Sequence, residues 1–440
     1  MSRAGCDRAI RVGLIGCGVV GTGILRLLRD NAGAIGGRLG APIEVRAIAV
    51  RDASRARDEV VPTALLTEDA LSVATHEEVD VVVEVVGGIE AAGRYVRAAL
   101  EAGKHVVTAN KALIAEEGDA LLELAEQRGV DLYFEAAVAG GIPILRVLRE
   151  GLASDRVVSV RGIVNGTSNY ILSRMRETGL GFDQALAEAQ ARGYAEADPT
   201  LDVGGGDARH KLTILATLAF GTRVHPSQIV TEGIDRVSAT DLRLAERFGY
   251  VIKPLAIARP VGERLELRVH PALLRTDDVL ASVPGAMNAV HVEGAMLGPC
   301  VLIGPGAGAT PTAMSVVSDV VDVGRNLQAR AHGRVPGRAF RGEELRQLAP
   351  VPAEEHRTRS YLRFTVADRP GVLARIAGLL ARFGVSIEEM VQQPSATADG
   401  AASLVMLTHE ARWGDLRAAL DEVDGLPLSH EPAHALRIES

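Results

Sequence analysis

The sequence predicts an α/β protein with more than one domain, on three observations. In the first third, apolar runs of strand length alternate with segments of helical periodicity, an order typical of a parallel sheet. A glycine-rich turn follows the first of these runs. Beyond about residue 360 the pattern changes to strand, helix, strand, strand, helix, strand. With 440 residues, 47% of them hydrophobic, the chain can form two or three domains with sizeable cores.

The first expected strand, residues 10–15, leads into a turn that predicts dinucleotide binding. Glycines stand there in the pattern G-x-G-x-x-G, and helical spacing resumes after it. The first glycine permits the tight turn, the second lets the backbone approach a pyrophosphate, and the third lets helix and strand pack closely. A glycine-rich turn that only packs is the alternative. We expect a Rossmann domain over residues 1–150, with the cofactor at Gly16, Gly18, Val19, Val20 and Gly21.

The second expected strand ends at Val50, and the residue after it bears on cofactor preference. Enzymes selective for NAD usually place an acid here, to bind the ribose 2′-hydroxyl. Arg51 stands there instead and would complement a 2′-phosphate, which favours NADP. Asp52 follows directly and weakens this argument, so NAD and a merely solvated arginine stay open.

Two more buried strands are expected within residues 79–88 and 103–108. Strand ends in an open α/β sheet face the ligand crevice, and Thr108 and Lys111 stand at such an end. Lys111 would neutralise a cofactor phosphate or bind a carboxylate substrate. A surface lysine at a helix start is the alternative.

An acidic stretch, residues 195–211, is the strongest candidate for a catalytic site. It contains Glu196, Asp202 and Asp207, and it ends at Lys211. Asp207 stands at the head of a predicted helix, and Lys211 lies one turn later on the same face. A solvated loop and a calcium or magnesium loop are alternatives, but the spacing is not that of an EF-hand and a lysine would oppose a cation. A catalytic pocket explains why carboxylates and a lysine occur together. The carboxylates would hold the ammonium group of a substrate, and the cationic lysine would transfer a proton.

The same stretch, "ARGYAEADPTLDVGGGDARHK", resembles the signature of homoserine dehydrogenases. Other blocks of that family occur in its order: "GLIGCGVVGTG", "VVVEVVGG", "GKHVVTANKALIA", "FEAAVAGGIPIL" and "GIVNGTSNYIL". The resemblance covers nearly the whole chain. It implies reversible hydride transfer between NAD(P)H and L-aspartate 4-semialdehyde, giving L-homoserine for threonine, methionine and isoleucine biosynthesis.

The resemblance also implies roles for single residues. Lys211 takes the place of the acid/base lysine and Asp207 that of the aspartate paired with it. Glu196 and Asp202 take the places of substrate-binding acids, and Lys111 that of a lysine near nicotinamide and substrate.

Two further sites follow from the resemblance alone. The family holds a sodium ion with one glutamate and backbone carbonyls, and the matching positions are Glu135, Val138, Gly140 and Ile142. The segment 304–330 is expected to return to the nucleotide domain and to bring Gly306 near the cofactor.

The remaining chain is expected to form a substrate-binding and dimerisation domain over 151–303, a linker over 331–359 and an ACT-like regulatory domain over 360–440. ACT domains commonly bind amino acids in paired copies, and Asp368 and Gly371 match the ligand turn. Inhibition by L-threonine is therefore a hypothesis, and a purely structural dimerisation module is the alternative. A homodimer or homotetramer is expected.

Composition excludes several other classes. A net charge of −8 and 3% aromatic residues argue against a nucleic-acid partner, and no window predicts a membrane span. Three cysteines, Cys6, Cys17 and Cys300, fit a reducing cytoplasm. Cys17 lies in the phosphate turn, and neither Cys6 nor Cys300 has an evident base beside it, which argues against the thiol chemistry of aspartate-semialdehyde dehydrogenase. A non-catalytic sensor of dinucleotide and amino acid remains the alternative function.

Overall fold

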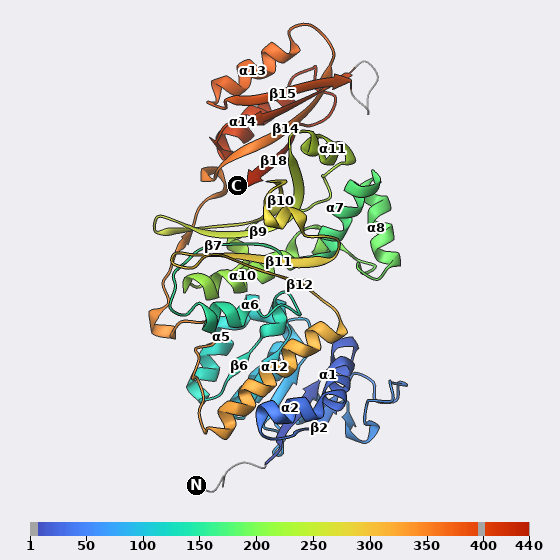
Figure 1. Cartoon of the computed structure of the whole chain (residues 1–440), viewed down its shortest axis with the longest axis vertical. Helices are drawn as coiled ribbons and strands as arrows, with labels where there is room; N and C mark the ends of the chain where they lie inside the picture. Colours follow the sequence, from blue (N-terminus) through green and yellow to red (C-terminus); the bar gives the residue numbers. More distant parts are fainter. Residues whose placement is uncertain (1–7, 395–400, 440) are drawn as a thin grey trace. The chain divides into compact units, whose positions relative to one another are not determined.

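The computed structural model describes residues 8–394 and 401–439, so Cys6 lies outside the described residues, and the chain divides into two compact units (Figure 1). The first unit comprises residues up to Gly166, Gly206–Ile229 and Ala286–Leu348. The second comprises Thr167–Gly205, Val230–Gly285 and the residues from Ala349 onward. Both units are therefore assembled from segments far apart in the sequence. The domain boundaries expected from the sequence group the residues differently and stay a prediction.

The first unit contains a parallel sheet of six strands in the order β3-β2-β1-β4-β5-β6. Its strands are β1 (Ile10–Ile15), β2 (Ile43–Ala49), β3 (Leu66–Thr67), β4 (Val81–Glu84), β5 (His105–Thr108) and β6 (Leu132–Tyr133). Helices α1 (Val19–Asp30), α2 (Ala32–Leu39), α3 (Ala70–Ala74), α4 (Glu90–Glu101) and α5 (Lys111–Arg128) alternate with them. Right-handed crossovers through helices are how parallel strands are joined, which explains the alternation read from the sequence. The predicted Rossmann-type domain is confirmed.

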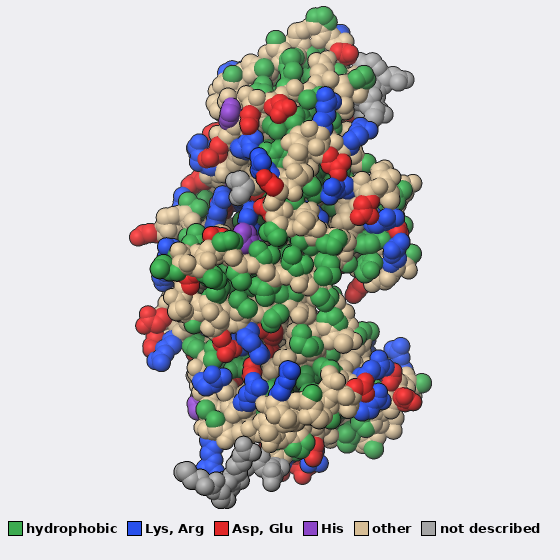
Figure 2. Space-filling model, viewed as in Figure 1, with side chains coloured by type: hydrophobic (Ala, Val, Ile, Leu, Met, Phe, Trp, Pro, Cys, Tyr) green, Lys and Arg blue, Asp and Glu red, His purple; other side chains and the backbone are tan. Residues whose placement is uncertain are grey.

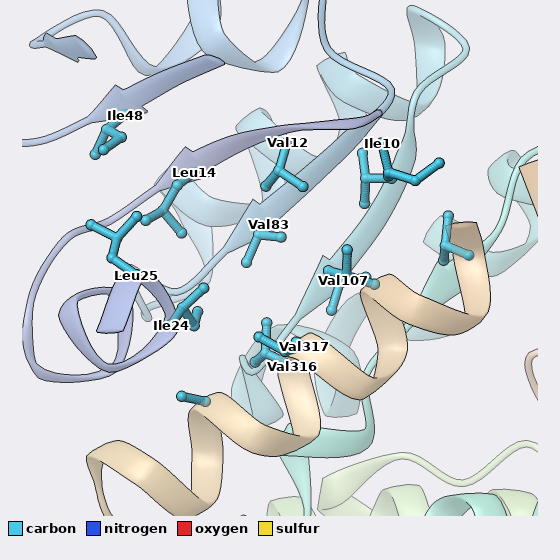
Figure 3. Close-up of a cluster of buried hydrophobic side chains, with 14 of the residues drawn as sticks. Ile10, Val12, Leu14, Ile24, Leu25, Ile48, Val83, Val107, Val316 and Val317 are labelled. Carbon is cyan, nitrogen blue, oxygen red and sulfur yellow. The ribbon is translucent and has the colours of Figure 1, made fainter. Parts of the chain in front are cut away.

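The core of this sheet includes a helix from much later in the chain. Side chains of β1, β2, β4, β5 and α1 pack into one apolar cluster with α12 (Ala309–Gln328) (Figure 3). Val316 and Val317 of α12 are almost fully buried there. Burying an aliphatic side chain of this size contributes about 1.5–3 kcal/mol. At Gly23 a β-carbon would lie 2.9 Å from the carbonyl oxygen of Ala309, so the glycine permits the close approach of α1 and α12.

The rest of the first unit supplies the elements of the candidate site. Strands β7 (Val157–Ile163), β11 (Met287–Gly294) and β12 (Gly298–Pro305) pair antiparallel in the order β7-β11-β12, and a short helix, α6 (Ile144–Arg146), precedes them. Helix α10 (Gly206–Phe220) is buried on most of its surface and packs on α5 and β7. Residues 212–220 of this helix are mainly apolar, as is typical of a helix in a protein interior.

The second unit is built on a mixed sheet with strands in the order β9-β10-β18-β14-β16-β15. These strands are β9 (Tyr250–Val261), β10 (Arg264–Arg275), β18 (His434–Glu439), β14 (Arg357–Ala367), β16 (Ala401–Thr408) and β15 (Ile387–Pro394). Short strands β8 (Val230–Thr231) and β13 (Ala349–Pro350) pair with β10, and β17 (Ala411–Arg412) pairs with β14. The helices are α7 (Gly166–Thr178, whose first residue belongs to the first unit), α8 (Phe182–Ala191), α9 (Thr200–Val203), α11 (Ala239–Arg247), α13 (Val372–Arg382) and α14 (Trp413–Asp424).

The predicted βαββαβ module is confirmed in the order β14, α13, β15, β16, α14 and β18. Its two helices pack on the sheet around Leu362, Phe364 and Ile376, which are almost fully buried. Strand β18 pairs antiparallel with β14 of the module and parallel with β10. One strand therefore joins the module to the long hairpin β9–β10.

Hydrophobic side chains reach the surface of the first unit on the hairpin β11–β12. Met296, Leu297 and Ile303 are 89%, 55% and 49% exposed. In Figure 2 green side chains gather over the part of the face where Figure 1 labels these two strands. Among the described residues, no helix has the length and apolarity needed to cross a bilayer.

Candidate active site

The three glycines of the first turn have the geometry that a dinucleotide-binding turn requires. Gly16 has φ +105°, a conformation that only glycine adopts without strain. A β-carbon on Gly21 would lie 2.3 Å from the carbonyl oxygen of Gly16, so the helix can approach the strand only because position 21 is glycine. Gly18 precedes α1, and a β-carbon there would meet no atom within 4 Å. The space in front of the helix N-terminus is therefore left open for a ligand.

A cavity of about 1430 Å³ opens above this turn and is large enough to hold a dinucleotide. Gly16, Gly18, Val19 and Arg51 line it. Val86 and Gly87 after β4 and Ala309 and Thr310 of α12 complete the wall. The cradle of glycine backbone and the helix N-terminus fit the pyrophosphate of NAD(P). The other residues predicted at the cofactor, Val20, Gly21, Thr108, Lys111 and Gly306, lie outside this lining.

The cavity is lined by arginines and by the carboxylates of Asp30, Asp52, Asp58 and Glu68. Arg51 is exposed at the strand end, and Arg26, Arg55 and Arg57 also line the cavity. Arg57 donates hydrogen bonds to the carbonyl oxygens of Cys17, 3.0 Å away, and Asp52, 2.8 Å away. It thus ties the loop after β2 to the glycine turn. The carboxylate of Asp52 accepts hydrogen bonds from the backbone and hydroxyl of Ser54.

Thr108 holds the wall of the cavity rather than lining it. Its hydroxyl donates to Glu84 at 2.5 Å, and both residues are fully buried. The other carboxylate oxygen of Glu84 accepts the backbone N–H groups of Val86 and Gly87. The two side chains therefore fix the loop that closes this part of the cavity.

Asp207 is the centre of a buried charged cluster in the first unit. Lys211 Nζ lies 2.7 Å from Asp207 Oδ2, and Lys111 Nζ lies 2.7 Å from Oδ1. Asn165 donates to Oδ2 at 2.8 Å, and Lys211 also donates to the carbonyl oxygen of Val164 at 2.6 Å. Asp207 and Lys211 are 2% and 8% exposed, whereas the Lys111 side chain is 38% exposed.

Local structure explains how these side chains meet. Asp207 and Lys211 stand four residues apart on α10, as predicted, so they share one face. Lys111 is the first residue of α5, and Asn110 caps that helix by accepting the N–H of Leu113 at 3.1 Å. Asn165 follows the end of β7. Two helices and one strand end therefore converge on a single carboxylate.

The electrostatics of the cluster favour a negative ligand atom. Burial opposes ionisation of Asp207, but the ammonium groups of Lys211 and Lys111 outweigh it and hold the pKa of Asp207 well below its usual range. The carboxylate is therefore charged, and with two ammonium groups beside it the cluster carries a formal charge of about +1. Such an arrangement can orient a proton donor and stabilise charge that develops on an oxygen.

The structure brings together Lys111, Asp207 and Lys211, and it places the other two predicted substrate residues in the second unit. Glu196 is exposed in the segment before α9. Asp202 is half-buried within α9, and its carbonyl oxygen accepts a hydrogen bond from the hydroxyl of Ser168 at 3.0 Å.

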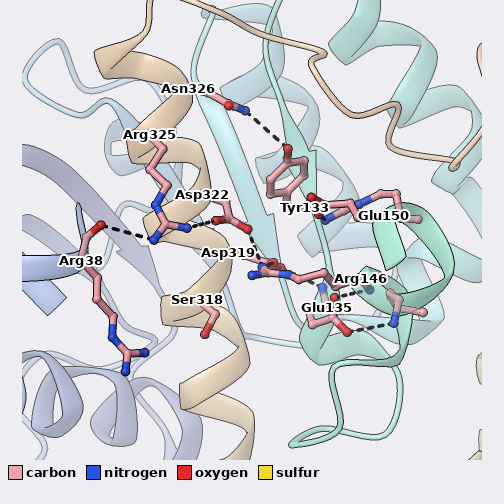
Figure 4. A network of polar contacts seen from close by, with 12 residues as sticks. Arg38, Tyr133, Glu135, Arg146, Glu150, Ser318, Asp319, Asp322, Arg325 and Asn326 are labelled. Atoms are coloured by element: carbon pink, nitrogen blue, oxygen red, sulfur yellow. Dashed lines mark hydrogen bonds and ion pairs between the residues drawn. The ribbon is translucent and has the colours of Figure 1, made fainter. Parts of the chain in front are cut away.

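The residues predicted to hold sodium lie in a buried segment of the first unit. Glu135 accepts the N–H groups of Leu145 and Arg146 at 2.9 and 2.8 Å, and its own N–H donates to Asp319 (Figure 4). Burial and the neighbouring Asp319 raise the pKa of Glu135 above its ordinary value. The guanidinium of Arg146 lies 3.4 Å from Asp319 and 2.6 Å from Asp322.

The predicted ion-binding residues offer only oxygen donors. No cluster of three or more His, Cys, Asp or Glu side chains that could hold a metal occurs among residues 8–394 and 401–439. Val138, Gly140 and Ile142 would contribute backbone carbonyls, and that of Gly140 also accepts the hydroxyl of Ser315 at 2.6 Å. Buried carbonyl and carboxylate oxygens suit a hard cation, so the donor set fits the predicted ion.

Two asparagines near these elements were not predicted as functional residues. Asn165 bonds to Asp207, and only the Asn-Gly pair after a strand hinted at its position. Asn288 is fully buried with both amide atoms unpaired, and a β-carbon on Gly306 would lie 2.0 Å from its Cγ. The structure therefore explains the glycine at 306 by contact with Asn288.

Asp368 and Gly371 lie together in the C-terminal module. They line a cavity of about 380 Å³ with Gln392, whose amide donates to Asp368 at 3.2 Å. Gly371 has φ +89° and precedes α13. The turn thus presents a helix N-terminus and a carboxylate to one small cavity.

Comparisons with known proteins agree with this architecture. Residues 16–135 match the family described as "Homoserine dehydrogenase, NAD binding domain", 143–321 match "Homoserine dehydrogenase", and 360–427 match "ACT domain". The homoserine dehydrogenase of Neisseria gonorrhoeae is 44% identical over 98% of this chain and 99% of its own. A crystal structure of a homoserine dehydrogenase from Thiobacillus denitrificans superposes with TM-score 0.93 and 45% identity, over 98% of this chain and 99% of that one. A hyperthermophilic archaeal homoserine dehydrogenase in complex with NADPH matches with TM-score 0.61 and 26% identity, over 72% and 98%.

Proposed function

The chain belongs to the homoserine dehydrogenase family, and from that premise we propose the role of each site residue in the interconversion of L-aspartate 4-semialdehyde and L-homoserine. When bound, the nicotinamide supplies the hydride to the aldehyde carbon. The carbonyl π electrons move to oxygen, and Lys211 donates the proton that forms the O–H bond. In the reverse direction neutral Lys211 removes that proton.

The main observation that supports this proposal is the position of Asp207 between two ammonium groups. The carboxylate and the Val164 carbonyl hold Lys211 in one direction, so the proton donor needs little reorganisation during the reaction. Lys111, paired with the other oxygen and more exposed, is the better candidate for contact with substrate and nicotinamide. Oxidation of L-homoserine with NADP or NAD, followed by absorbance of the reduced cofactor, tests the function. No turnover with either cofactor would overturn it.

Glu196 and Asp202 are proposed to bind the ammonium group of the substrate. Glu196 is exposed in the segment before α9, and Asp202 stands in this short helix, where its carbonyl oxygen accepts the hydroxyl of Ser168. Asp202→Asn should therefore raise the KM for L-homoserine more than it lowers kcat. An unchanged KM would remove the assignment.

NADP is proposed as the preferred cofactor. Arg51, Arg55 and Arg57, which follow β2, line the cavity where a 2′-phosphate would lie, and the carboxylate of Asp52 accepts hydrogen bonds from Ser54. A lower KM for NADP than for NAD supports this preference, and the reverse order contradicts it.

Sodium is proposed as the resident cation, held by Glu135 and the carbonyls of Val138, Gly140 and Ile142. Its support is a buried donor set made only of oxygen atoms, with the carboxylate of Asp319 beside it. The melting temperature of the protein should be higher in sodium chloride than in an equal concentration of choline chloride. Equal values would argue against the ion.

L-Threonine is proposed as an effector at the cavity of Asp368 and Gly371. A carboxylate and a helix N-terminus in one cavity can bind the two charged groups of a free amino acid. Calorimetry with millimolar threonine tests binding, and rate measurements at near-saturating substrate test inhibition. The absence of both effects would contradict the proposal.

A homodimer or homotetramer is proposed, with the apolar hairpin β11–β12 as a contact surface. Exposed Met296, Leu297 and Ile303 on one hairpin are typical of a surface that another chain covers. Light scattering gives the mass in solution, and a monomer would exclude the proposal.

A further inference from the structure

The ion pair Arg437–Glu232 lies in the second unit and connects two parts of it. Arg437 on β18 is 1% exposed, and its guanidinium lies 3.7 Å from the ring centroid of Trp413 on α14. One of its terminal nitrogens lies 2.9 Å from Glu232, whose side chain is 39% exposed. A guanidinium so deeply buried depends on its carboxylate partner, because an uncompensated charge in the interior is strongly unfavourable.

Glu232 directly follows β8 and is fixed to the long hairpin. Its N–H donates to the carbonyl oxygen of Val269 at 2.8 Å, which extends the parallel pairing of β8 with β10. Two contacts thus fix the segment after β8. The side chain of Glu232 forms the ion pair with Arg437, and its backbone N–H is bonded to β10.

That segment packs directly on the residues that follow Asp202. The N–H of Ile234 donates to the carbonyl oxygen of Val203 at 2.9 Å. A β-carbon on Gly233 would lie 2.6 Å from the same oxygen and 3.0 Å from Cα of Gly204. A β-carbon on Gly205, which has φ +83°, would lie 3.0 Å from the Thr231 side chain. Backbone touches backbone here, so a shift of one segment displaces the other.

We infer that Glu232 and Arg437 are positioning residues for substrate binding: through residues 231–234 they hold the turn 203–205 and with it Asp202. The inference rests on the proposed role of Asp202. It makes the C-terminal module a support of the substrate site, because the guanidinium that anchors Glu232 stands on β18 and stacks on Trp413 of α14.

Steady-state kinetics of L-homoserine oxidation by the full chain tests the inference. Glu232→Gln keeps the shape of the side chain and removes its charge. It should raise the KM for L-homoserine by about tenfold, with a smaller change in kcat and an unchanged KM for NADP, because a displaced Asp202 would bind the substrate ammonium less well in the ground state and in the transition state alike. Glu232→Asp should recover part of the loss.

A matched control is available in the same unit. Glu355 pairs with a single arginine, Arg264 on β10, at 2.7 Å, and its side chain is 38% exposed. This ion pair joins the segment before β14 to the start of β10, whereas residues 203–205 pack on residues 231–234. Glu355→Gln should therefore leave both KM values at the wild-type level. An equal rise in the KM for L-homoserine in both variants would overturn the inference, since any loss of an ion pair would then produce it.

Three further variants separate the possible failures. The double variant Glu232→Gln/Arg437→Met leaves no unpaired buried charge, so it tests positioning even if Glu232→Gln folds poorly, and it should still raise the KM. Gly233→Ala places a methyl group against Val203 and should raise the same KM. If Asp202→Asn raises the KM but neither Glu232→Gln nor the double variant does so, positioning is refuted and the role of Asp202 stands. If Asp202→Asn leaves the KM unchanged, the role of Asp202 fails and the inference falls with it.

Discussion

Replacing Lys211 by alanine is the most direct test of the proposed proton transfer. The structure separates its effect on chemistry from its effect on folding, because Asp207 does not lose all its partners. Lys111 remains 2.7 Å from Oδ1, and Asn165 still donates to Oδ2. The carboxylate thus stays compensated, and the variant should fold.

The expected loss follows from what the side chain contributes. General acid catalysis accelerates reactions by about 10² to 10⁴. At about 1.4 kcal/mol per factor of ten, that range corresponds to roughly 3 to 5 kcal/mol of transition-state stabilisation. We expect kcat of Lys211→Ala to fall by about this factor, while the dissociation constant of NADPH, measured by its fluorescence, changes little.

Lys111→Ala is the matched control, since it removes an ion pair of equal length to the same carboxylate. Its kcat should fall less, and its KM for L-homoserine should rise. Small primary amines should partly rescue Lys211→Ala, because they can enter the space left by the side chain. A kcat near that of the wild type in Lys211→Ala, or a larger loss of kcat in Lys111→Ala, would refute the assignment of the proton donor.

Three other predictions concern the cofactor, the fold and pH. Arg51→Gln should raise the KM for NADP and leave that for NAD nearly unchanged; equal effects on both would contradict a 2′-phosphate contact. Gly306→Ala should lower the melting temperature, because its β-carbon would lie 2.0 Å from Cγ of Asn288; Gly306→Ala/Asn288→Gly should restore part of the loss. Burial opposes ionisation of Asp241, but His434 and Arg363 outweigh it and lower the pKa of that carboxyl. Its contribution to stability is therefore full above the unfolded-state pKa of about 3.9 and is lost as pH falls through the folded-state pKa. Urea unfolding at several pH values should show a smaller loss of stability in acid for Asp241→Asn than for the wild type.

Sequence patterns predicted those parts of the fold that depend on residues close together in the chain. The strand before Gly16, the turn and the helix after it are contiguous, so periodicity and glycine positions were sufficient. The pairing of Asp207 with Lys211 followed from helical geometry in the same way. The family resemblance added the roles of the residues, which spacing alone left open.

The rest depends on contacts between distant segments. Nothing near Lys111 in the sequence shows that its ammonium meets Asp207, because that contact requires α5 to pack on α10. The position of Thr108 at a strand end suggested the cofactor, whereas its hydroxyl bonds to Glu84, a partner set by the pairing of β4 with β5. Likewise, the two compact units are made of interleaved segments, which composition along the chain does not reveal.

The position of β18 has a consequence for synthesis of the chain on the ribosome. The pairing of Arg268 with Glu439 spans 171 residues. At about 5 to 20 residues per second, roughly 10 to 35 s pass between the emergence of β10 and that of its neighbour. During that time one edge of β10 lacks this partner, and the buried arginine of that strand lacks one of its carboxylates. The nascent second unit therefore exposes an unpaired strand edge, a template for aggregation, until β18 is synthesised.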